Sequence, residues 1–195
     1  MKRLIPVGGS SDKTTDITNN LVESMLRYQP DKVKVAFCVF ARLEDDWAKV
    51  MDNKVTQIEK FVGRNKKISY KLLTDENFIE VSAWADIIFM PGGDPYILKE
   101  KLEKHGDLKK LWDNKVIVGS SAGAMVMCNK YVYLQDKTIG QGFGWLEVSC
   151  LPHYGSGFSG YTQEDWERAE LELLKQSPGQ PVLRLAEGEF AEFTV

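Results

Sequence analysis

Apolar and polar positions alternate along the chain in blocks that predict a succession of strands and helices. Short apolar runs bounded by glycine, proline or polar clusters are typical of buried strands, whereas apolar residues spaced three and four apart are typical of amphipathic helices. By these criteria we expect strands at 4–7, 33–40, 68–73, 87–90 and 115–118, helices at 16–27, 45–62 and 95–104, and a short helical turn at 107–112. This alternation predicts parallel pairing through helical crossovers, and hence a doubly wound, mostly parallel α/β sheet with helices on both faces.

The pattern changes after Cys128. The remaining runs predict strands at 131–134 and 145–150, a helix at 164–174, and a closing pair of antiparallel strands at 182–185 and 190–195. Because no repeat, linker or low-complexity tract divides the sequence, we expect a single α/β domain over residues 1–195. Ligand sites of such sheets lie beyond the carboxyl ends of the strands, so the loops 8–12, 91–94 and 119–123 should converge.

Composition narrows the function classes. Of the 195 residues, 43% are hydrophobic and 27% are charged, which is the balance of a soluble globular protein. A net charge of -3 provides no electrostatic footprint for DNA or RNA, so nucleic acid is not an expected partner. No apolar run approaches the roughly 20 residues that a membrane span needs, and the first apolar stretch is too short for a signal peptide. A membrane is therefore not an expected partner either.

Cysteines and glycines exclude further classes. Cys38, Cys128 and Cys150 lie in apolar neighbourhoods without close pairing, which favours buried thiols in a reducing cytoplasm over a disulfide framework. With two histidines and no Cys-x-x-Cys motif, a His/Cys zinc site is not expected. The glycine-rich segments 8–11 and 140–144 lack the spacing of a nucleotide-binding loop. We therefore expect a cytoplasmic monomer or homodimer that uses no metal or other cofactor.

One short motif points to chemistry. Gly119-x-Ser121-x-Gly123 lies between a predicted strand and an apolar helical stretch, which is the setting of a nucleophile elbow. Such a turn needs small flanking residues because it holds the nucleophile in a strained conformation above the sheet. Ser120 is adjacent, but only Ser121 has glycines at both required offsets. Ser121 is therefore the predicted nucleophile.

A serine needs a base to take its proton, and the base needs an acceptor to orient it. His105 ends a charged helix and is expected to be solvated, whereas His153 follows an apolar strand and precedes a glycine-containing loop. His153 is therefore the predicted base. Glu187 follows a predicted strand and precedes a glycine, which makes it a candidate acceptor; Glu189 and Asp136 remain alternatives.

An oxyanion hole requires two N–H donors aimed at one point. The residue after the nucleophile usually supplies the first, which here is Ala122. The Pro-Gly-Gly-Asp segment at 91–94 offers backbone without side chains where a carbonyl oxygen could sit. The second donor is expected to be the amide of Gly93 or of Gly92.

Four segments together resemble the dipeptidase E and cyanophycinase family of serine peptidases, whose fold is similar to the flavodoxin-like class I glutamine amidotransferase domain. Their order and separations agree with the family across nearly the whole chain. The segments are Pro91-Gly92-Gly93-Asp94, Gly119-Ser120-Ser121-Ala122-Gly123-Ala124, Leu151-Pro152-His153-Tyr154 and Leu185-Ala186-Glu187-Gly188. The Ser-Ala-Gly-Ala elbow, followed about 30 residues later by Pro-His and an aromatic residue, is quite specific.

The resemblance implies a serine peptidase in which Ser121, His153 and Glu187 form a triad and the amides of Gly93 and Ala122 form the oxyanion hole. The chain order of serine, histidine and glutamate differs from the serine, acid, histidine order of α/β-hydrolases, which argues against an ordinary esterase. A family-like pocket is narrow, so the expected substrate is a dipeptide or short peptide, hydrolysed through an acyl-enzyme.

Two departures from the family concern the substrate, for which Gly92, Asp94 and Tyr154 are the expected binding residues. Aspartyl dipeptidases carry Gly-Gly-Asn-Thr where this chain continues from Gly93 into Asp94-Pro95. They also share an arginine at the start of the helix after the histidine loop, where this chain has the acidic stretch 163–167. Carboxylates repel a substrate carboxylate, so we expect that N-terminal aspartate is not the preferred residue.

Two other functions would be compatible with the same amidotransferase-like fold. A binding or sensing module that lost catalysis would not need the retained serine, histidine and glutamate. A glutaminase normally has cysteine as its elbow nucleophile, and this chain has Ser121.

Overall fold

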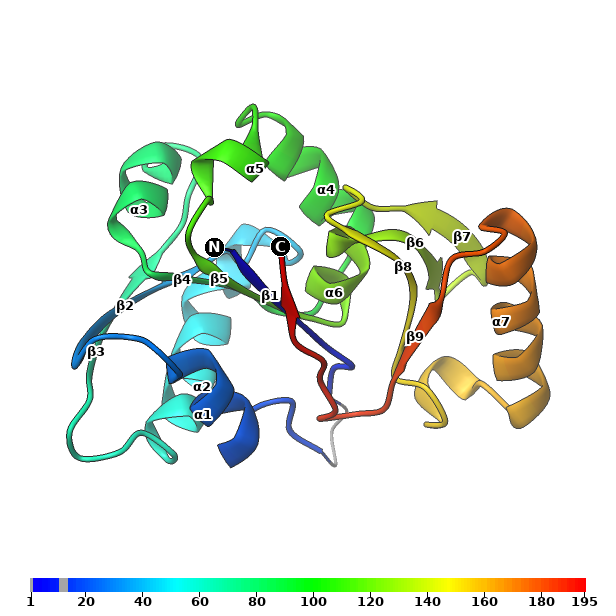
Figure 1. The fold of residues 1–195 in the computed structure, drawn as a ribbon, viewed down its shortest axis with the longest axis horizontal. Helices are drawn as coiled ribbons and strands as arrows, with labels where there is room; N and C mark the ends of the chain where they lie inside the picture. The colour runs from blue at the N-terminus through cyan, green and yellow to red at the C-terminus, as the bar shows by residue number, and fades with distance from the viewer. Residues whose placement is uncertain (1, 11–13) are drawn as a thin grey trace.

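The structure, a computed structural model, describes residues 2–10 and 14–195 (Figure 1). The larger of its two sheets has six strands in the order β10-β1-β5-β4-β2-β3. They are β1 (Arg3–Val7), β2 (Lys32–Phe37), β3 (Lys67–Leu72), β4 (Ile87–Met90), β5 (Val116–Ser120) and β10 (Phe193–Thr194). Neighbouring strands are parallel except at one edge, where β10 runs antiparallel to β1. The predicted parallel α/β sheet is confirmed.

Helices cover both faces of this sheet. They are α1 (Asn19–Leu26), α2 (Trp47–Glu59), α3 (Phe78–Trp84), α4 (Pro95–Glu103), α5 (Leu108–Leu111) and α6 (Ala122–Met127). In Figure 1, α3, α4 and α5 lie above the sheet and α1 and α2 below it, and α6 contacts both sheets. Strands β4 and β5 are buried at every residue because helices cover both of their faces, which explains their uninterrupted small and apolar sequences.

A second sheet adjoins the first and has the strand order β7-β6-β8-β9. Its strands are β6 (Cys128–Tyr133), β7 (Thr138–Gln141), β8 (Leu146–Pro152) and β9 (Val182–Leu185). Helix α7 (Gln163–Gln176) packs on it through Trp166, Ala169 and Leu173. Two 3₁₀ turns, η1 (Glu44–Asp46) and η2 (Phe158–Gly160), lie in loops. The chain therefore places its predicted base, at the end of β8, on the second sheet and its predicted nucleophile on the first.

The closing strands do not form the pair that the sequence predicts. Strand β9 pairs in parallel with β8 in the second sheet, and β10 pairs antiparallel with β1 in the first. Between them, residues 186–190 cross the junction of the two sheets, where Phe190 makes an isolated bridge with Val7. The prediction of a closing pair is wrong because two strands that are close in the sequence have partners far from it.

Several boundaries also differ from the prediction. Helix α1 begins at Asn19 because the Thr18 side chain caps it by accepting from the Leu21 N–H. The strand predicted at 33–40 ends at Phe37, where its parallel partner β3 also ends. Two elements were not predicted at all: the short helix α3 and strand β7, whose glycine-containing sequence pairs antiparallel with β6.

The three cysteine side chains are fully buried and free, as predicted. Burial raises the pKa of the Cys38 thiol to about 12, which keeps it protonated near neutral pH. Within the described ranges, the helices are all too short or too polar to cross a membrane.

Candidate active site

Ser121 occupies a strained turn between β5 and α6. Its backbone has φ 48° and ψ -103°, a conformation that L-residues adopt only where the surroundings enforce it. The flanking glycines are required by packing, since a Cβ on Gly119 would lie 2.4 Å from the Gly123 carbonyl carbon, and one on Gly123 would lie 2.4 Å from the Met90 oxygen. The Ser121 N–H donates to the Val7 carbonyl at 2.9 Å, which ties the turn to β1. This is the local geometry of a nucleophile elbow.

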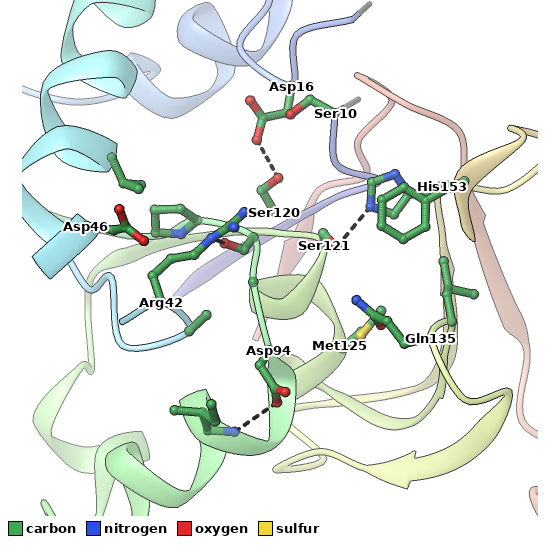
Figure 2. A pocket seen from close by; sticks show the side chains of 18 of the residues that line it. Ser10, Asp16, Arg42, Asp46, Asp94, Ser120, Ser121, Met125, Gln135 and His153 are labelled. Carbon is green, nitrogen blue, oxygen red and sulfur yellow. Dashed lines mark hydrogen bonds between the residues drawn. The ribbon is translucent and has the colours of Figure 1, made fainter. Parts of the chain in front are cut away.

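His153 lies where β8 ends and also has a positive φ, 58°. Its backbone N–H donates to the Gly8 carbonyl at 2.8 Å. Its imidazole is stacked on the Phe158 ring, with centroids 4.0 Å apart and planes inclined by 12°. In this position Nε2 lies 3.0 Å from the Ser121 Oγ, within hydrogen-bond reach (Figure 2).

Glu187 is the carboxylate that reaches His153. It lies in the turn after β9, and its Oε1 is 3.4 Å from the His153 Nδ1, while Oε2 accepts a hydrogen bond from the Thr14 hydroxyl. The two alternatives make other contacts: Glu189 accepts from the Ala186 N–H, and Asp136 accepts from Thr138. A carboxylate beside Nδ1 favours the tautomer in which Nδ1 carries the proton and Nε2 is free to accept one.

Burial sets the protonation of His153, whose side chain is only 2% exposed. Desolvation lowers the pKa of the imidazole below its ordinary 6.5, and the hydrogen bond and charge of Glu187 act in the opposite direction and are smaller. The imidazole is therefore neutral at neutral pH, the form that can accept a proton from a serine hydroxyl.

Two backbone segments that carry N–H groups lie next to Ser121. Ala122 is the first residue of α6, so its N–H has no acceptor within the helix. On the other side, Gly92 packs against Ser121: a Cβ on Gly92 would lie 3.3 Å from the Ser121 Cβ. A Cβ on Gly93 would lie 2.2 Å from the Ala41 carbonyl oxygen, so only glycine fits there. These are the segments from which the sequence predicts the two oxyanion-hole donors.

A cavity of about 780 Å³ opens over Ser121 and His153. Gly92, Gly93 and Asp94 line it as well, so the loops after β4 and β5 converge as predicted. Of the loop predicted at 8–12, Ser10 lines the cavity, and residues 11 and 12 lie outside the described residues. The cavity volume falls within the roughly 300–1,000 Å³ of pockets that enclose small ligands.

Three expectations about surrounding residues need correction. Tyr154 does not line the cavity, because its ring packs on Trp166 in the core of the second sheet. His105 is not a solvated end residue: its ring stacks on Phe78 with centroids 3.7 Å apart, and Nε2 bonds to Asp75. The acidic stretch 163–167 contributes no residue to the lining of the cavity. It forms the first turn of α7, where Asp165 completes the capping box with Thr162 and pairs with Lys137.

Asp94 lines the cavity as expected, although its carboxylate is already engaged. Oδ1 accepts from the N–H groups of Tyr96 and Ile97 and so caps α4, and Oδ2 accepts from the Tyr133 hydroxyl at 3.1 Å. Asp94 therefore joins the loop after β4 to the second sheet.

Four charged residues at the cavity were not predicted: Asp16, Arg42, Asp46 and Lys54. Asp16 is 1% exposed and accepts from the Ser120 hydroxyl (Figure 2). It also forms an ion pair with Lys54. The Arg42 Nε donates to the Gly92 carbonyl at 2.7 Å. Asp16 and Ser120 are 104 positions apart, so no local pattern marks them as partners. In the ranges 2–10 and 14–195, no three His, Cys, Asp or Glu side chains are grouped so as to hold a metal ion.

Comparisons with known proteins agree with the fold. A search of the curated proteins found no match. A crystal structure of a peptidase from an acI-B1 Actinobacterium is similar with a TM-score of 0.72 and 19% identity, covering 99% of this chain and 83% of that one. A protein from Listeria monocytogenes EGD-e described as a peptidase E is similar with a TM-score of 0.69 and 16% identity, covering 100% of this chain and 99% of that one. At these identities the likeness concerns the fold.

The family model is the decisive finding. The model of peptidase family S51 matches residues 4–194, nearly the whole chain. The chain therefore belongs to peptidase family S51, the dipeptidase E family, and is a serine peptidase.

Proposed function

We propose that the protein hydrolyses dipeptides or short peptides, with Ser121 as nucleophile, His153 as general base and acid, and Glu187 as the carboxylate that orients His153. The observation that carries this proposal is the 3.0 Å separation of the Ser121 Oγ and the His153 Nε2 inside the cavity. The strained backbone of Ser121 and the lowered pKa of His153 support it, because both prepare the pair for transfer of the hydroxyl proton.

In the first half-reaction, Ser121 Oγ bonds to the carbonyl carbon of the substrate while its proton moves to His153 Nε2. The carbonyl oxygen gains the negative charge, and the N–H groups of Gly93 and Ala122 donate to it. The bond to the leaving nitrogen then breaks as His153 returns the proton to that nitrogen, which leaves an ester on Ser121. In the second half, water attacks the ester, gives its proton to His153, and Ser121 regains it as the acid product leaves.

The preference of the cavity for its substrate can be stated in terms of charge. Among the described residues, three carboxylates line it, those of Asp16, Asp46 and Asp94, against the two cationic side chains of Arg42 and Lys54. Lys54 pairs with Asp16, and Arg42 donates through its Nε to the uncharged carbonyl of Gly92. This excess of negative charge disfavours a substrate carboxylate. We retain the prediction that N-terminal aspartate is not preferred, on these residues rather than on the stretch 163–167.

The test is cleavage of a dipeptide and short-peptide library, together with labelling by a fluorophosphonate. We expect turnover by the wild type, its loss in Ser121→Ala, and labelling of Ser121 identified by mass spectrometry. Ser120→Ala is the matched comparison because it removes the neighbouring hydroxyl; its Ser121 should still be labelled. Full turnover by Ser121→Ala would refute the mechanism. Absence of both turnover and labelling in the wild type would indicate a binding module instead, and ammonia release from glutamine a glutaminase.

A further inference from the structure

Arg42 makes an unusual contact beside the candidate oxyanion hole. It follows β2, and its side chain lines the cavity that contains Ser121. The guanidinium Nε donates to the carbonyl oxygen of Gly92 at 2.7 Å. Gly92 touches Ser121 through its Cα side, where an added Cβ would lie 3.3 Å from the Ser121 Cβ. Arg42 therefore binds the peptide that joins Gly92 to Gly93, next to the predicted nucleophile.

That contact determines where the next N–H points. No peptide bond in the described ranges is cis, and in a trans peptide the C=O and N–H bonds point in opposite directions. With the Gly92 oxygen turned towards Arg42, the Gly93 N–H is turned away from it. Ser121 packs against Gly92, next to the same peptide.

A Gly-Gly peptide has little intrinsic preference for this orientation. Glycine populates both signs of φ almost equally, so rotation about the bonds on either side of the peptide can exchange the places of the C=O and the N–H. In the reversed orientation a carbonyl oxygen, rather than a donor, would face the developing oxyanion. Among the described residues, the Gly93 N–H has no backbone acceptor that would hold it in place. The Gly92 carbonyl is thus the point at which the orientation can be held.

The backbone of Arg42 is itself well anchored. Its carbonyl accepts from the indole N–H of the buried Trp47 at 2.9 Å, and its own N–H donates to the Val39 carbonyl at 3.0 Å. The preceding residue, Ala41, accepts from the Asp94 N–H at 2.9 Å. The backbone that carries Arg42 is therefore tied to the loop whose Gly92 carbonyl Arg42 binds.

We propose that Arg42 is a positioning residue that holds the Gly92–Gly93 peptide with its N–H towards the oxyanion. This rests on the proposed function, because it presumes that Gly93 donates to a substrate oxygen charged during acyl transfer. Arg42 contributes to the transition state more than to substrate binding, since a ground-state carbonyl oxygen carries less charge.

The experiment compares Arg42→Met, which keeps the length of the side chain without a donor, with Arg42→Lys, which keeps a donor. Removing an oxyanion-hole donor outright lowers kcat by roughly 10²–10³. Because the peptide can still visit its active orientation, we expect Arg42→Met to lower kcat by about tenfold to a hundredfold with KM within about twofold. Arg42→Lys should recover part of kcat. Arg27→Met is the matched control, since Arg27 is an exposed arginine in an ion pair with Glu192.

A second readout separates positioning from a merely structural effect. A peptide aldehyde forms a tetrahedral adduct with the serine, so its affinity should fall in Arg42→Met by the same factor as kcat/KM, whereas a non-reactive substrate analogue should bind as before. Unchanged kcat, a change confined to KM, or an unchanged aldehyde affinity would each overturn the role. Should Arg42→Met not fold, the same two readouts on Arg42→Lys decide the matter. The proposed function itself fails if Ser121→Ala remains active or if the wild type shows neither turnover nor labelling, and neither outcome depends on Arg42.

Discussion

Substitution of Gly9 by alanine tests the geometry of the site without removing any functional group. Gly9 lies after β1 with φ +104°, next to both predicted catalytic side chains. An added Cβ would lie 2.5 Å from the His153 Cε1, 2.6 Å from its Nε2 and 3.1 Å from the Ser121 Cβ. The new methyl group would therefore occupy the space between the imidazole and the serine.

The size of the effect follows from these distances. Ordinary contact begins at 3.4 Å, so the ring must withdraw by about 0.9 Å. The loop itself is held, because the Gly9 carbonyl accepts from the Gly188 N–H and the Gly8 N–H donates to the Glu189 carbonyl, both at 2.9 Å. The distance from Nε2 to the Ser121 Oγ then grows from 3.0 Å to as much as about 3.9 Å, beyond hydrogen-bond reach. General-base catalysis contributes roughly 10²–10⁴ to the rate, and most of it should be lost.

The assay measures kcat/KM for a cleaved peptide together with the melting temperature. Gly179→Ala is the matched control: Gly179 has φ +81°, and nothing lies within 4 Å of its added Cβ. Both substitutions carry a left-handed backbone cost of about 1–2 kcal/mol, so both should lower Tm by several degrees. Only Gly9→Ala should lose activity. If Gly9→Ala kept its activity within about threefold of the control, the proposed role of the Ser121–His153 contact would be refuted.

Three further predictions concern charge, capping and burial. The proposed mechanism needs neutral His153, whose pKa is lowered, so kcat/KM should rise with pH below 6.5 and level off by neutrality. Glu187→Gln removes an influence that raises this pKa, so the rise should move to lower pH. Because the pKa of His153 is lower in the folded than in the unfolded protein, the free energy of unfolding should fall as the pH drops from 6.5 through the folded-state pKa. Denaturant titration at several pH values measures this loss. Asp94→Ala removes the cap of α4 and should lower the free energy of unfolding by about 1 kcal/mol, measured as a fall in Tm of about 2–4 °C. Asp94→Asn should retain most of the stability that the cap contributes. The three buried cysteines should resist a thiol reagent such as DTNB in the native state and all react after unfolding; a native thiol that reacts at the unfolded rate would contradict their burial.

Much of the site could be predicted because its signals are local in the sequence. The elbow requires small residues at fixed offsets from Ser121, and a turn of this kind leaves the same pattern wherever it occurs. His153 could be identified because only one other histidine competes with it. The choice among Glu187, Glu189 and Asp136 could not be made from the residues alone, since it depends on which turn meets His153 in space.

The contacts that the sequence did not predict join residues that are far apart along the chain. Arg42 and Asp16 look like ordinary surface charges, and their roles depend on Gly92 and Ser120, which are 50 and 104 positions away. The same holds for the closing strands, because an apolar run shows that a strand forms without showing which edge it joins. The central strands of the first sheet were predicted more reliably, since burial on both faces leaves an uninterrupted apolar run.

Three consecutive carbonyl groups explain why the loop after β1 is as important as the elbow. The Val7 oxygen accepts from the Ser121 N–H at 2.9 Å, the Gly8 oxygen from the His153 N–H at 2.8 Å, and the Gly9 oxygen from the N–H of Gly188, next to Glu187, at 2.9 Å. Each segment that carries a predicted triad residue thus binds the same stretch of backbone, although the segments come from two different sheets. A Cβ on Gly8 would lie 2.0 Å from the Ala186 oxygen, so this close approach requires glycine. Gly8 and Gly9, which superficially resemble part of a phosphate-binding loop, therefore help to hold the three segments next to one another.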